Sequence, residues 1–220
     1  MRGALASRSM QTILPHPHPP AADAAGPSLS HFVGEGLSER TDQTQPMKIF
    51  GLAGWSGSGK TTLLTQLIPE LVRRGVTVST MKHAHHEFDV DQPGKDSYRH
   101  REAGATEVMI SSARRFALMH ELRGAPEPML EELIQHMTPV DLLLVEGFKA
   151  HGHDKLEVHR ATLGKPLLCT EDRRIIAVAS DAPIPNLKLP RVDLNDVPAV
   201  ADLILTHSGL WKSVRRAAGA

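Results

Sequence analysis

The sequence predicts an α/β protein whose doubly wound, mainly parallel sheet carries helices on both faces. From residue 47 onward, short and nearly continuous apolar runs alternate with segments whose apolar residues recur at helical spacing. Strands that are buried on both faces of a parallel sheet have this continuous pattern. A glycine-rich loop also joins the first apolar run directly to the first helical segment. Strand, loop and helix in this order are typical of parallel α/β domains.

The first elements lie on either side of the glycine-rich loop. Residues 48–53 form an apolar run that predicts a strand, and residues 63–72 carry leucine, isoleucine and valine at helical spacing. Gly75 predicts the end of that helix, because glycine readily adopts the left-handed conformation that closes a helix. The run at residues 76–81 predicts a second strand.

The middle of the chain predicts shorter elements. Residues 95–103 predict a helix that Gly104 ends. The runs at residues 107–111 and 115–120 predict neighbouring strands joined by a short polar turn. A further helix is predicted from Pro128 onward. The apolar face of this helix consists of Met129, Leu130, Leu133, Ile134 and Met137.

The last part of the chain completes the predicted interior. Residues 141–145, 156–159 and 175–179 are apolar runs that predict three more strands. Residues 198–206 predict a closing helix. We find no internal repeat.

The chain divides into one domain and two tails. Residues 1–46 are rich in proline, alanine, serine and histidine and lack apolar periodicity, which predicts disorder. Alternatively, this extension reflects a start assigned too far upstream, because structured patterning begins directly after Met47. Residues 47–210 form the predicted domain, and residues 211–220 a C-terminal tail.

Composition excludes several classes of protein. The chain has 220 residues with 25 Lys+Arg against 25 Asp+Glu and a pI near 7.3. Such a neutral chain projects no large positive field, which argues against nucleic acid as a partner. Its single cysteine cannot form an internal disulfide, which indicates a reducing, cytoplasmic compartment. No apolar run approaches the roughly 20 residues that span a bilayer, so we expect no membrane association.

The strongest chemical signal is the loop itself. Its pattern, Gly54 followed after four residues by Gly59, Lys60 and Thr61, matches the phosphate-binding loop of nucleotide-binding proteins. Glycines allow backbone N–H groups to surround a phosphate at a helix N-terminus. Lys60 is the candidate for contact with the β- and γ-phosphates during catalysis, and the Thr61 hydroxyl for ligating Mg²⁺. The candidate nucleotide-binding residues of the loop are Gly54, Ser56, Gly57, Ser58, Gly59, Lys60, Thr61 and Thr62.

Three acids are candidates for the metal side of this site. Asp89 and Asp91 follow the second predicted strand, where phosphate-loop proteins often place an element that senses the γ-phosphate. Glu146 ends the apolar run at 141–145, a position that suits an acid holding Mg²⁺ or orienting an attacking water during catalysis. Each could instead be an ordinary solvated acid. Asp141, at the opposite end of its strand, is predicted to be structural.

Basic residues form a third group. Lys82, Lys95, Arg99 and Arg101 could bind phosphates or a second anionic ligand, although a solvated charged helix would have the same composition. Three histidines, at positions 83, 85 and 86, suggest a transition metal. Without a nearby cysteine their spacing matches no closed zinc pattern, which disfavours that interpretation.

Four segments together closely resemble the molybdopterin-guanine dinucleotide biosynthesis protein B (MobB) family. They are residues 54–62, 82–97, 100–105 and 145–149, and the resemblance covers about residues 47–209. It implies a phosphate-loop GTPase that forms a homodimer, uses GTP and Mg²⁺, and partners the guanylyltransferase that attaches GMP to molybdopterin. Molybdopterin cofactor itself becomes a candidate ligand.

Recognition of guanine has no familiar motif in this chain, because no Asn-Lys-x-Asp sequence is present. Asp181 follows the strand predicted at 175–179 and could accept hydrogen bonds from guanine N1–H and the 2-amino group. Alternatively, Asp181 only starts the turn before Pro183.

Three functions compete. The resemblance favours a GTP-binding adapter for the guanylyltransferase, with at most slow GTP hydrolysis. The alternatives are a phosphate-loop kinase for a small molecule and a GTPase that inserts nickel into enzymes. Whether the protein is an enzyme is therefore open, with a low-turnover GTPase as the expectation. The predicted hairpin at 107–120 is a candidate for pairing across a dimer, or an ordinary hairpin within the domain.

Overall fold

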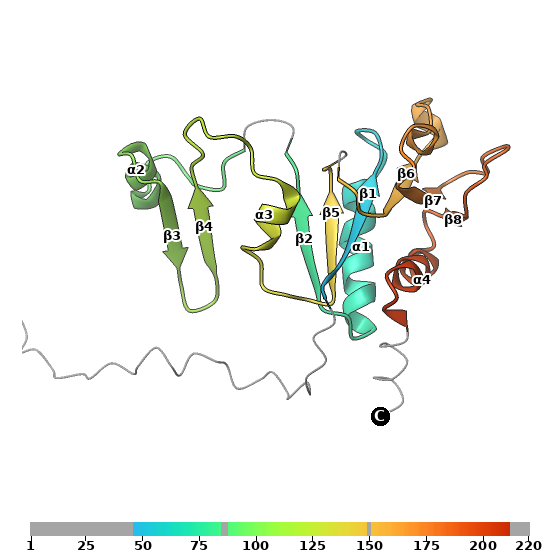
Figure 1. The fold of residues 1–220 in the computed structure, drawn as a ribbon, viewed down its shortest axis with the longest axis horizontal. Coiled ribbons are helices and arrows are strands. Elements are labelled where there is room, and N and C mark those ends of the chain that lie inside the picture. Colours follow the sequence, from blue (N-terminus) through green and yellow to red (C-terminus); the bar gives the residue numbers. More distant parts are fainter. Residues whose placement is uncertain (1–45, 85–87, 149–150, 212–220) are drawn as a thin grey trace, which may run out of the picture. The chain divides into compact units, whose positions relative to one another are not determined.

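The computed structural model describes residues 46–84, 88–148 and 151–211. Within them, a six-stranded sheet has the order β2-β5-β1-β6-β7-β8, and all its neighbouring strands are parallel (Figure 1). The predicted α/β class with a mainly parallel sheet is confirmed. The strands are β1 (Lys48–Ala53), β2 (Val78–Lys82), β5 (Leu142–Glu146), β6 (Lys155–His159), β7 (Ile175–Ser180) and β8 (Arg191–Asp193).

The helices have recognisable local ends. After α1, Gly75 adopts a φ of 81° and donates its N–H to the Val72 carbonyl oxygen at 2.9 Å, as predicted for a helix-ending glycine. Before α4, the Asp196 carboxylate accepts the Ala199 N–H at 3.0 Å and caps the helix. The helical elements are α1 (Lys60–Arg73), α2 (Asp96–Glu102), α3 (Leu130–Ile134), α4 (Val197–His207) and the 3₁₀ turns η2 (Ala161–Leu163) and η3 (Leu168–Thr170).

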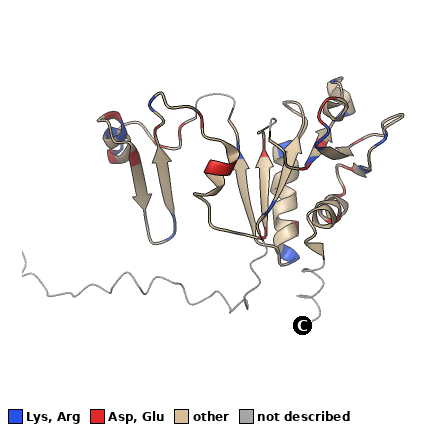
Figure 2. Ribbon diagram, in the orientation of Figure 1, with Lys and Arg blue, Asp and Glu red and all other residues tan. Residues whose placement is uncertain are grey.

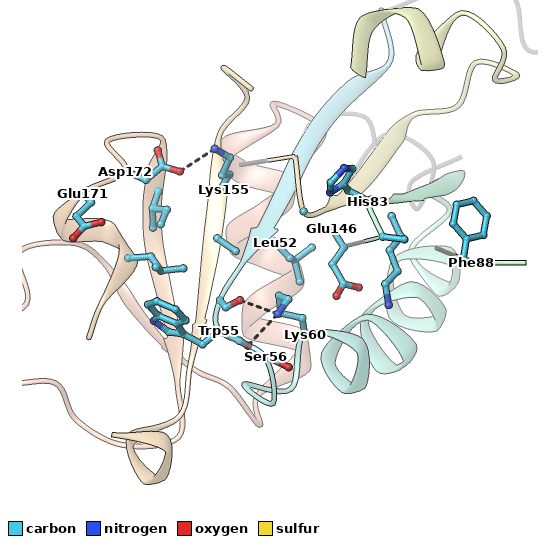
Figure 3. Close-up of a pocket in the computed structure, with 17 residues that line it drawn as sticks. Leu52, Trp55, Ser56, Lys60, His83, Phe88, Glu146, Lys155, Glu171 and Asp172 are labelled. Carbon is cyan, nitrogen blue, oxygen red and sulfur yellow. Dashed lines mark hydrogen bonds and ion pairs between the residues drawn. The ribbon is translucent and has the colours of Figure 1, made fainter. Parts of the chain in front are cut away.

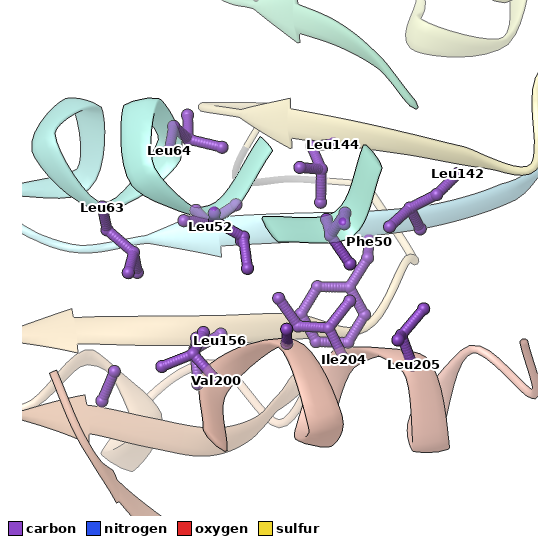
Figure 4. Packing of buried hydrophobic residues seen from close by; sticks show 14 of the residues in the cluster. Phe50, Leu52, Leu63, Leu64, Leu142, Leu144, Leu156, Val200, Ile204 and Leu205 are labelled. Carbon is purple, nitrogen blue, oxygen red and sulfur yellow. The ribbon is translucent and has the colours of Figure 1, made fainter. Parts of the chain in front are cut away.

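The main core lies between the sheet and helices α1 and α4 (Figure 4). Phe50 and Leu52 alternate along β1 and point to this side, where Leu67 of α1 and Ile204 of α4 are fully buried. Each such side chain stabilises the fold by about 1.5–3 kcal/mol. This packing fixes α1 against β1, and with it the loop that joins them.

The second face of the sheet is partly apolar and partly polar. Over β5, Leu143 and Val145 pack against Leu130 of α3. Over β6, by contrast, the buried residues are Lys155 and Glu157, which share one face because side chains alternate along a strand. Helices therefore cover both faces, as predicted. The part of the second face over β6, however, carries the charged side chains of Lys155 and Glu157.

A separate antiparallel hairpin is formed by β3 (Glu107–Ser111) and β4 (Phe116–His120), as predicted. Its register places Met109 opposite Leu118 and Ser111 opposite Phe116. In Figure 2 both strands are almost uncoloured, since Glu107 is the only Lys, Arg, Asp or Glu residue in them. The hairpin is apolar without belonging to the main core.

One predicted helix is shorter than expected, and one strand was not predicted. The helix predicted from Pro128 is only five residues long, because His136 and Met137 donate to carbonyls three residues back and Pro139 follows. Strand β8 was not predicted, since three residues are too short to give a pattern. The other predicted strands and helices are present, with bounds shifted by at most two to three residues.

Some predictions lie outside the described residues. They concern nearly all of the extension at 1–46, the tail from 212 to 220, and two of the three clustered histidines, at positions 85 and 86. Among the residues that the structure describes, no helix is long and apolar enough to cross a membrane.

Candidate functional site

The loop between β1 and α1 has the backbone of a phosphate-binding loop. Gly54, Gly57 and Gly59 adopt φ values of 145°, 80° and 98°, a region that other residues rarely enter. At Gly54 a Cβ atom would also lie only 2.6 Å from the Val158 carbonyl oxygen and 2.7 Å from the Ser58 hydroxyl oxygen. Glycine is therefore required at the first position of the motif.

Lys60 begins α1 and folds back over the loop. Its Nζ donates hydrogen bonds to the carbonyl oxygens of Gly54 at 2.8 Å and Trp55 at 3.1 Å. The first turn of α1 contains no acidic residue. The N-terminus of this fourteen-residue helix therefore keeps its partial positive charge for an anion.

A cleft of about 1260 Å³ opens beside the loop. Lys60, Lys82 and Glu146 line it, together with His83 (Figure 3). Lys82 and Glu146 are paired residues at the ends of neighbouring parallel strands, so their side chains reach the same edge of the sheet. The structure thus brings the loop lysine, a second lysine and one of the three predicted acids together.

Asp89 and Asp91 lie elsewhere. Asp89 accepts a hydrogen bond from the Arg101 guanidinium at 2.6 Å, and Asp91 accepts one from the Ser97 hydroxyl at 2.8 Å. The Arg101 contact, followed by the backbone N–H of Asp91, lowers the pKa of Asp89. Neither acid lines the cleft. They fasten the segment before α2 to that helix.

The predicted basic group is divided in the same way. Lys82 lines the cleft, whereas Lys95, Arg99 and Arg101 lie at or on α2 and do not line it. Arg101 also approaches Glu121 at 3.4 Å, and Arg99 approaches Asp96 at 3.9 Å.

Among the described residues, no cluster of three or more histidine, cysteine or acidic side chains could hold a metal ion. Mg²⁺ at nucleotide sites needs only one or two protein groups, because phosphates and waters complete its coordination. Thr61 at the start of α1 and Glu146 in the cleft fit that requirement. The oxygen donors of these two residues are chemically suited to Mg²⁺.

Asp181 is linked to the loop by Arg160, a residue that the sequence analysis did not identify. Arg160, directly after β6, donates to the Ser58 carbonyl oxygen at 3.2 Å and to the Asp181 carboxylate at 3.3 Å. The other Asp181 oxygen accepts the Ala161 N–H at 3.3 Å. Asp181 is thus held in place and connected to the phosphate loop, rather than only starting a turn. A basic residue at the carboxyl end of a predicted strand was the available signal for Arg160.

The cleft extends to a partly buried ion pair that sequence reasoning also missed. The Lys155 ammonium group, 2% exposed, lies 2.9 Å from the Asp172 carboxylate. Burial would raise the pKa of Asp172, but hydrogen bonds from Lys155 and from the backbone N–H of Arg174 outweigh it and lower that pKa. The signal for Lys155 was the alternation Lys155-Leu156-Glu157. In a strand that is covered on both sides, this alternation places two charged side chains on one buried face.

A neutral histidine lies beside this pair. The His153 ring covers Gly51 so closely that a Cβ there would be 2.5 Å from its Nε2 atom. Burial, then the charges of Lys155 and His151, lower the pKa of His153 to about 4. The ring is therefore uncharged at neutral pH. Gly51 is glycine because the ring occupies the space of its side chain.

The family model described as "Molybdopterin guanine dinucleotide synthesis protein B" matches residues 49–181. This span contains the loop, the cleft, the hairpin and Asp181, and exceeds half of the chain. The chain belongs to the MobB family.

Curated MobB relatives align with this chain along most of their own length. The chain is 45% identical over 160 residues to the molybdopterin-guanine dinucleotide biosynthesis adapter protein of Escherichia coli K12, covering 71% of this chain and 91% of the relative. It is 43% identical over 159 residues to the protein of the same name from Haemophilus influenzae, covering 71% and 86%.

A solved MobB structure has the same fold. The crystal structure of molybdopterin-guanine biosynthesis protein B superposes with a TM-score of 0.57 at 28% identity, covering 72% of this chain and 98% of the other. The predicted MobB resemblance is thereby confirmed at the level of sequence and of fold.

Proposed function

We propose that this MobB-family chain is a GTP-binding adapter for the guanylyltransferase that converts molybdopterin cofactor to its guanine dinucleotide form. One observation carries the proposal: a phosphate loop with the required positive-φ glycines opens onto a cleft lined by Lys60, Lys82 and Glu146. The relatives named as adapter proteins support the cofactor pathway, because they match most of the domain.

The residues divide the work as follows. The loop N–H groups and the α1 N-terminus bind the phosphates, and Lys60 exchanges its carbonyl partners for β- and γ-phosphate oxygens. Thr61 and Glu146 hold Mg²⁺, which neutralises phosphate charge when bound. Lys82, at the same edge of the sheet, adds a second positive charge beside the phosphates.

Slow hydrolysis fits the composition of the cleft. Among the described residues, Glu146 is its only acid near the loop, and no arginine lines it. An arginine at the transferring phosphate accelerates such hydrolysis by about 10³–10⁵-fold in GTPases. Arg160 is at the loop, but its guanidinium is bound to the Ser58 carbonyl oxygen and to Asp181 outside the cleft, so the site favours holding GTP over consuming it.

Asp181 is proposed to recognise guanine. Replacing it with asparagine is expected to weaken GTP binding at least tenfold, to about the affinity for ATP, because an amide cannot accept both guanine N–H bonds. Calorimetry of the full chain with Mg²⁺ and each nucleotide measures this. Asp96→Asn, an exposed acid on α2, is the control. If Asp181→Asn still prefers GTP over ATP as strongly as the parent chain, Asp181 does not recognise guanine.

The adapter role predicts binding that depends on the nucleotide. Affinity of the full chain for the guanylyltransferase is expected to rise at least fivefold with Mg²⁺–GTP, because ligands shift equilibria through differential binding. Surface plasmon resonance with and without nucleotide measures it. Equal affinity in both conditions argues against the adapter role, and rapid acceptor-dependent use of ATP would indicate a kinase.

We propose that two copies of the chain form a homodimer by packing the exposed apolar faces of their β3–β4 hairpins together. Phe116, Met109 and Leu118 share that face by their register and are 71%, 62% and 44% exposed. A two-stranded hairpin is marginally stable alone, and an apolar face of this kind indicates an interaction site. A second copy of the same face is self-complementary, which suits a two-fold dimer.

A further inference from the structure

The chain has an unusual backbone directly after Glu146. Glu146 ends β5, and the next two residues, Gly147 and Phe148, adopt φ values of 93° and 46°. The left-handed conformation is unfavourable for a residue that carries a side chain, and it persists only where surrounding contacts enforce it. Glycine meets this condition at position 147 without cost, whereas Phe148 does not. Contacts around Phe148 therefore hold this turn in place.

The start of the turn is fixed against the end of β2. His83 follows β2 and donates its N–H to the Glu146 carbonyl oxygen at 2.9 Å. A Cβ atom on Gly147 would lie only 2.7 Å from the Cβ atom of His83. The backbone up to Gly147 is thus set by its neighbour in the sheet, and the direction of the chain beyond it is set at Phe148.

The Phe148 ring lies between two histidine rings. Its centroid is 5.1 Å from that of His83 at an interplanar angle of 59°, and 5.3 Å from that of His151 at 71°. Tilted and edge contacts of this kind are the favourable arrangements of ring pairs. Phe148 is 8% exposed and also packs in the core cluster over β5. We call these three rings the aromatic clamp.

Both histidines of the aromatic clamp are oriented by acids from one short segment. His83 Nε2 lies 2.6 Å from the Glu127 carboxylate, just before α3. His151 Nδ1 approaches the Glu131 carboxylate, on α3, at 3.5 Å. Because the two pairs come from the same segment, α3 and the residues before it hold both walls of the clamp around Phe148.

The Glu146 side chain depends on this turn for its direction. Within residues 46–84, 88–148 and 151–211, its carboxylate makes no hydrogen bond or ion pair. In Figure 3 this carboxylate nevertheless points toward Lys60. Since no polar partner orients it, the backbone on either side of Glu146 does so.

We propose that Phe148 is a positioning residue for Glu146: the aromatic clamp enforces the left-handed turn and thereby directs the Glu146 carboxylate to the Mg²⁺ that accompanies the nucleotide. This inference rests on the proposed function, in which Glu146 holds Mg²⁺. Strained backbone is concentrated at functional sites, which agrees with such a role. The competing interpretation is that Phe148 only fills the core over β5, as Leu143 and Val145 do.

The test measures how strongly Mg²⁺ increases the affinity for GTP. Calorimetry of the full chain gives the dissociation constant of GTP in EDTA and in Mg²⁺, and we call the ratio of the two the metal enhancement. Phe148→Leu keeps an apolar side chain but removes the ring contacts. It is expected to lower the metal enhancement at least fivefold and to leave the affinity in EDTA within twofold of the parent.

A matched control comes from the same core cluster. Ile49 on β1 packs against that cluster but is not part of the aromatic clamp. Ile49→Ala should therefore lower the Tm and leave the metal enhancement within twofold of the parent. If Ile49→Ala lowers the metal enhancement as much as Phe148→Leu does, Phe148 only fills the core.

A second pair of variants tests the clamp from its other side. His83→Ala removes one wall and should lower the metal enhancement at least threefold. His83→Phe should restore it to within twofold of the parent, because a phenyl ring can pack against Phe148 without an imidazole nitrogen. If His83→Phe behaves like His83→Ala, the imidazole acts by itself and the clamp is wrong. This pair decides the question even if Phe148→Leu does not fold.

Glu146→Gln distinguishes the inference from the proposed function. If the metal enhancement persists in Glu146→Gln, the assignment of Glu146 to Mg²⁺ fails, whatever Phe148 does. If it is lost in Glu146→Gln but keeps the parent value in Phe148→Leu, only the positioning role is overturned. An equal loss of GTP affinity with and without Mg²⁺ in Phe148→Leu also overturns it, since the residue would then act on the fold and not on the metal side.

Discussion

Replacing Lys60 with alanine is expected to weaken GTP binding about 100-fold, which corresponds to about 2.7 kcal/mol. Lys60 Nζ lies over the loop within 3.1 Å of two loop carbonyl oxygens, and under the proposed function it exchanges these partners for phosphate oxygens. Hydrogen bonds between charged groups typically contribute about 1.5–3 kcal/mol, so a loss of this size is expected from one lysine. Calorimetry of the full chain with Mg²⁺–GTP gives the affinity directly.

The same substitution should leave the fold intact. The two carbonyl oxygens that Lys60 contacts become available to water, and the core between α1 and the sheet is unchanged. The midpoint temperature of thermal unfolding, Tm, should therefore change by only a few degrees. Lys188→Ala, at an exposed lysine outside the cleft, is the matched control for loss of positive charge. Parent-like affinity in Lys60→Ala would contradict the role of the loop.

Replacing Phe116 with lysine is expected to convert the proposed dimer into a monomer. Burial of a phenylalanine contributes about 1.5–3 kcal/mol, and a two-fold interface contains the residue twice. The dissociation constant of the dimer should therefore rise at least about 100-fold. Analytical ultracentrifugation over a range of concentrations measures the constant for both proteins.

The control for this experiment is a matched substitution elsewhere. Val72 on α1 is also apolar and 56% exposed, so Val72→Lys makes the same kind of change away from the hairpin. It should leave the oligomeric state unchanged. A parent chain that sediments as a monomer, or a Phe116→Lys variant that remains dimeric, would show that the hairpin does not join two copies.

Most of the fold could be predicted because the information is local. Apolar runs predicted five of the six parallel strands, and Gly75 predicted the end of α1. The exceptions have physical causes. Strand β8 is held by pairing with β7 over three residues, and α3 stops early near Pro139, so neither depends on periodicity alone.

The candidate site could be predicted where it depends on one segment. The loop is contiguous, so Lys60 and its glycines were found by spacing. Arg160 is connected to Ser58 across 102 residues, and Lys155 meets Asp172 only after β6 and the turn before β7 have packed. For Asp89 the sequence could not show that Arg101 would bind it. Such pairings depend on tertiary structure.

The position of β1 has a consequence for how the protein is made. Although β1 comes first in the domain, it lies between β5 and β6, with Lys48 opposite Leu142 and Ala53 opposite Glu157. During synthesis β1, which precedes the phosphate loop, can therefore pair only after β5 and β6, about one hundred residues downstream, have been made. Closing such long loops is entropically costly and slows folding. A nascent or truncated chain that ends before β5 contains the complete motif but lacks the sheet that gives the loop its shape.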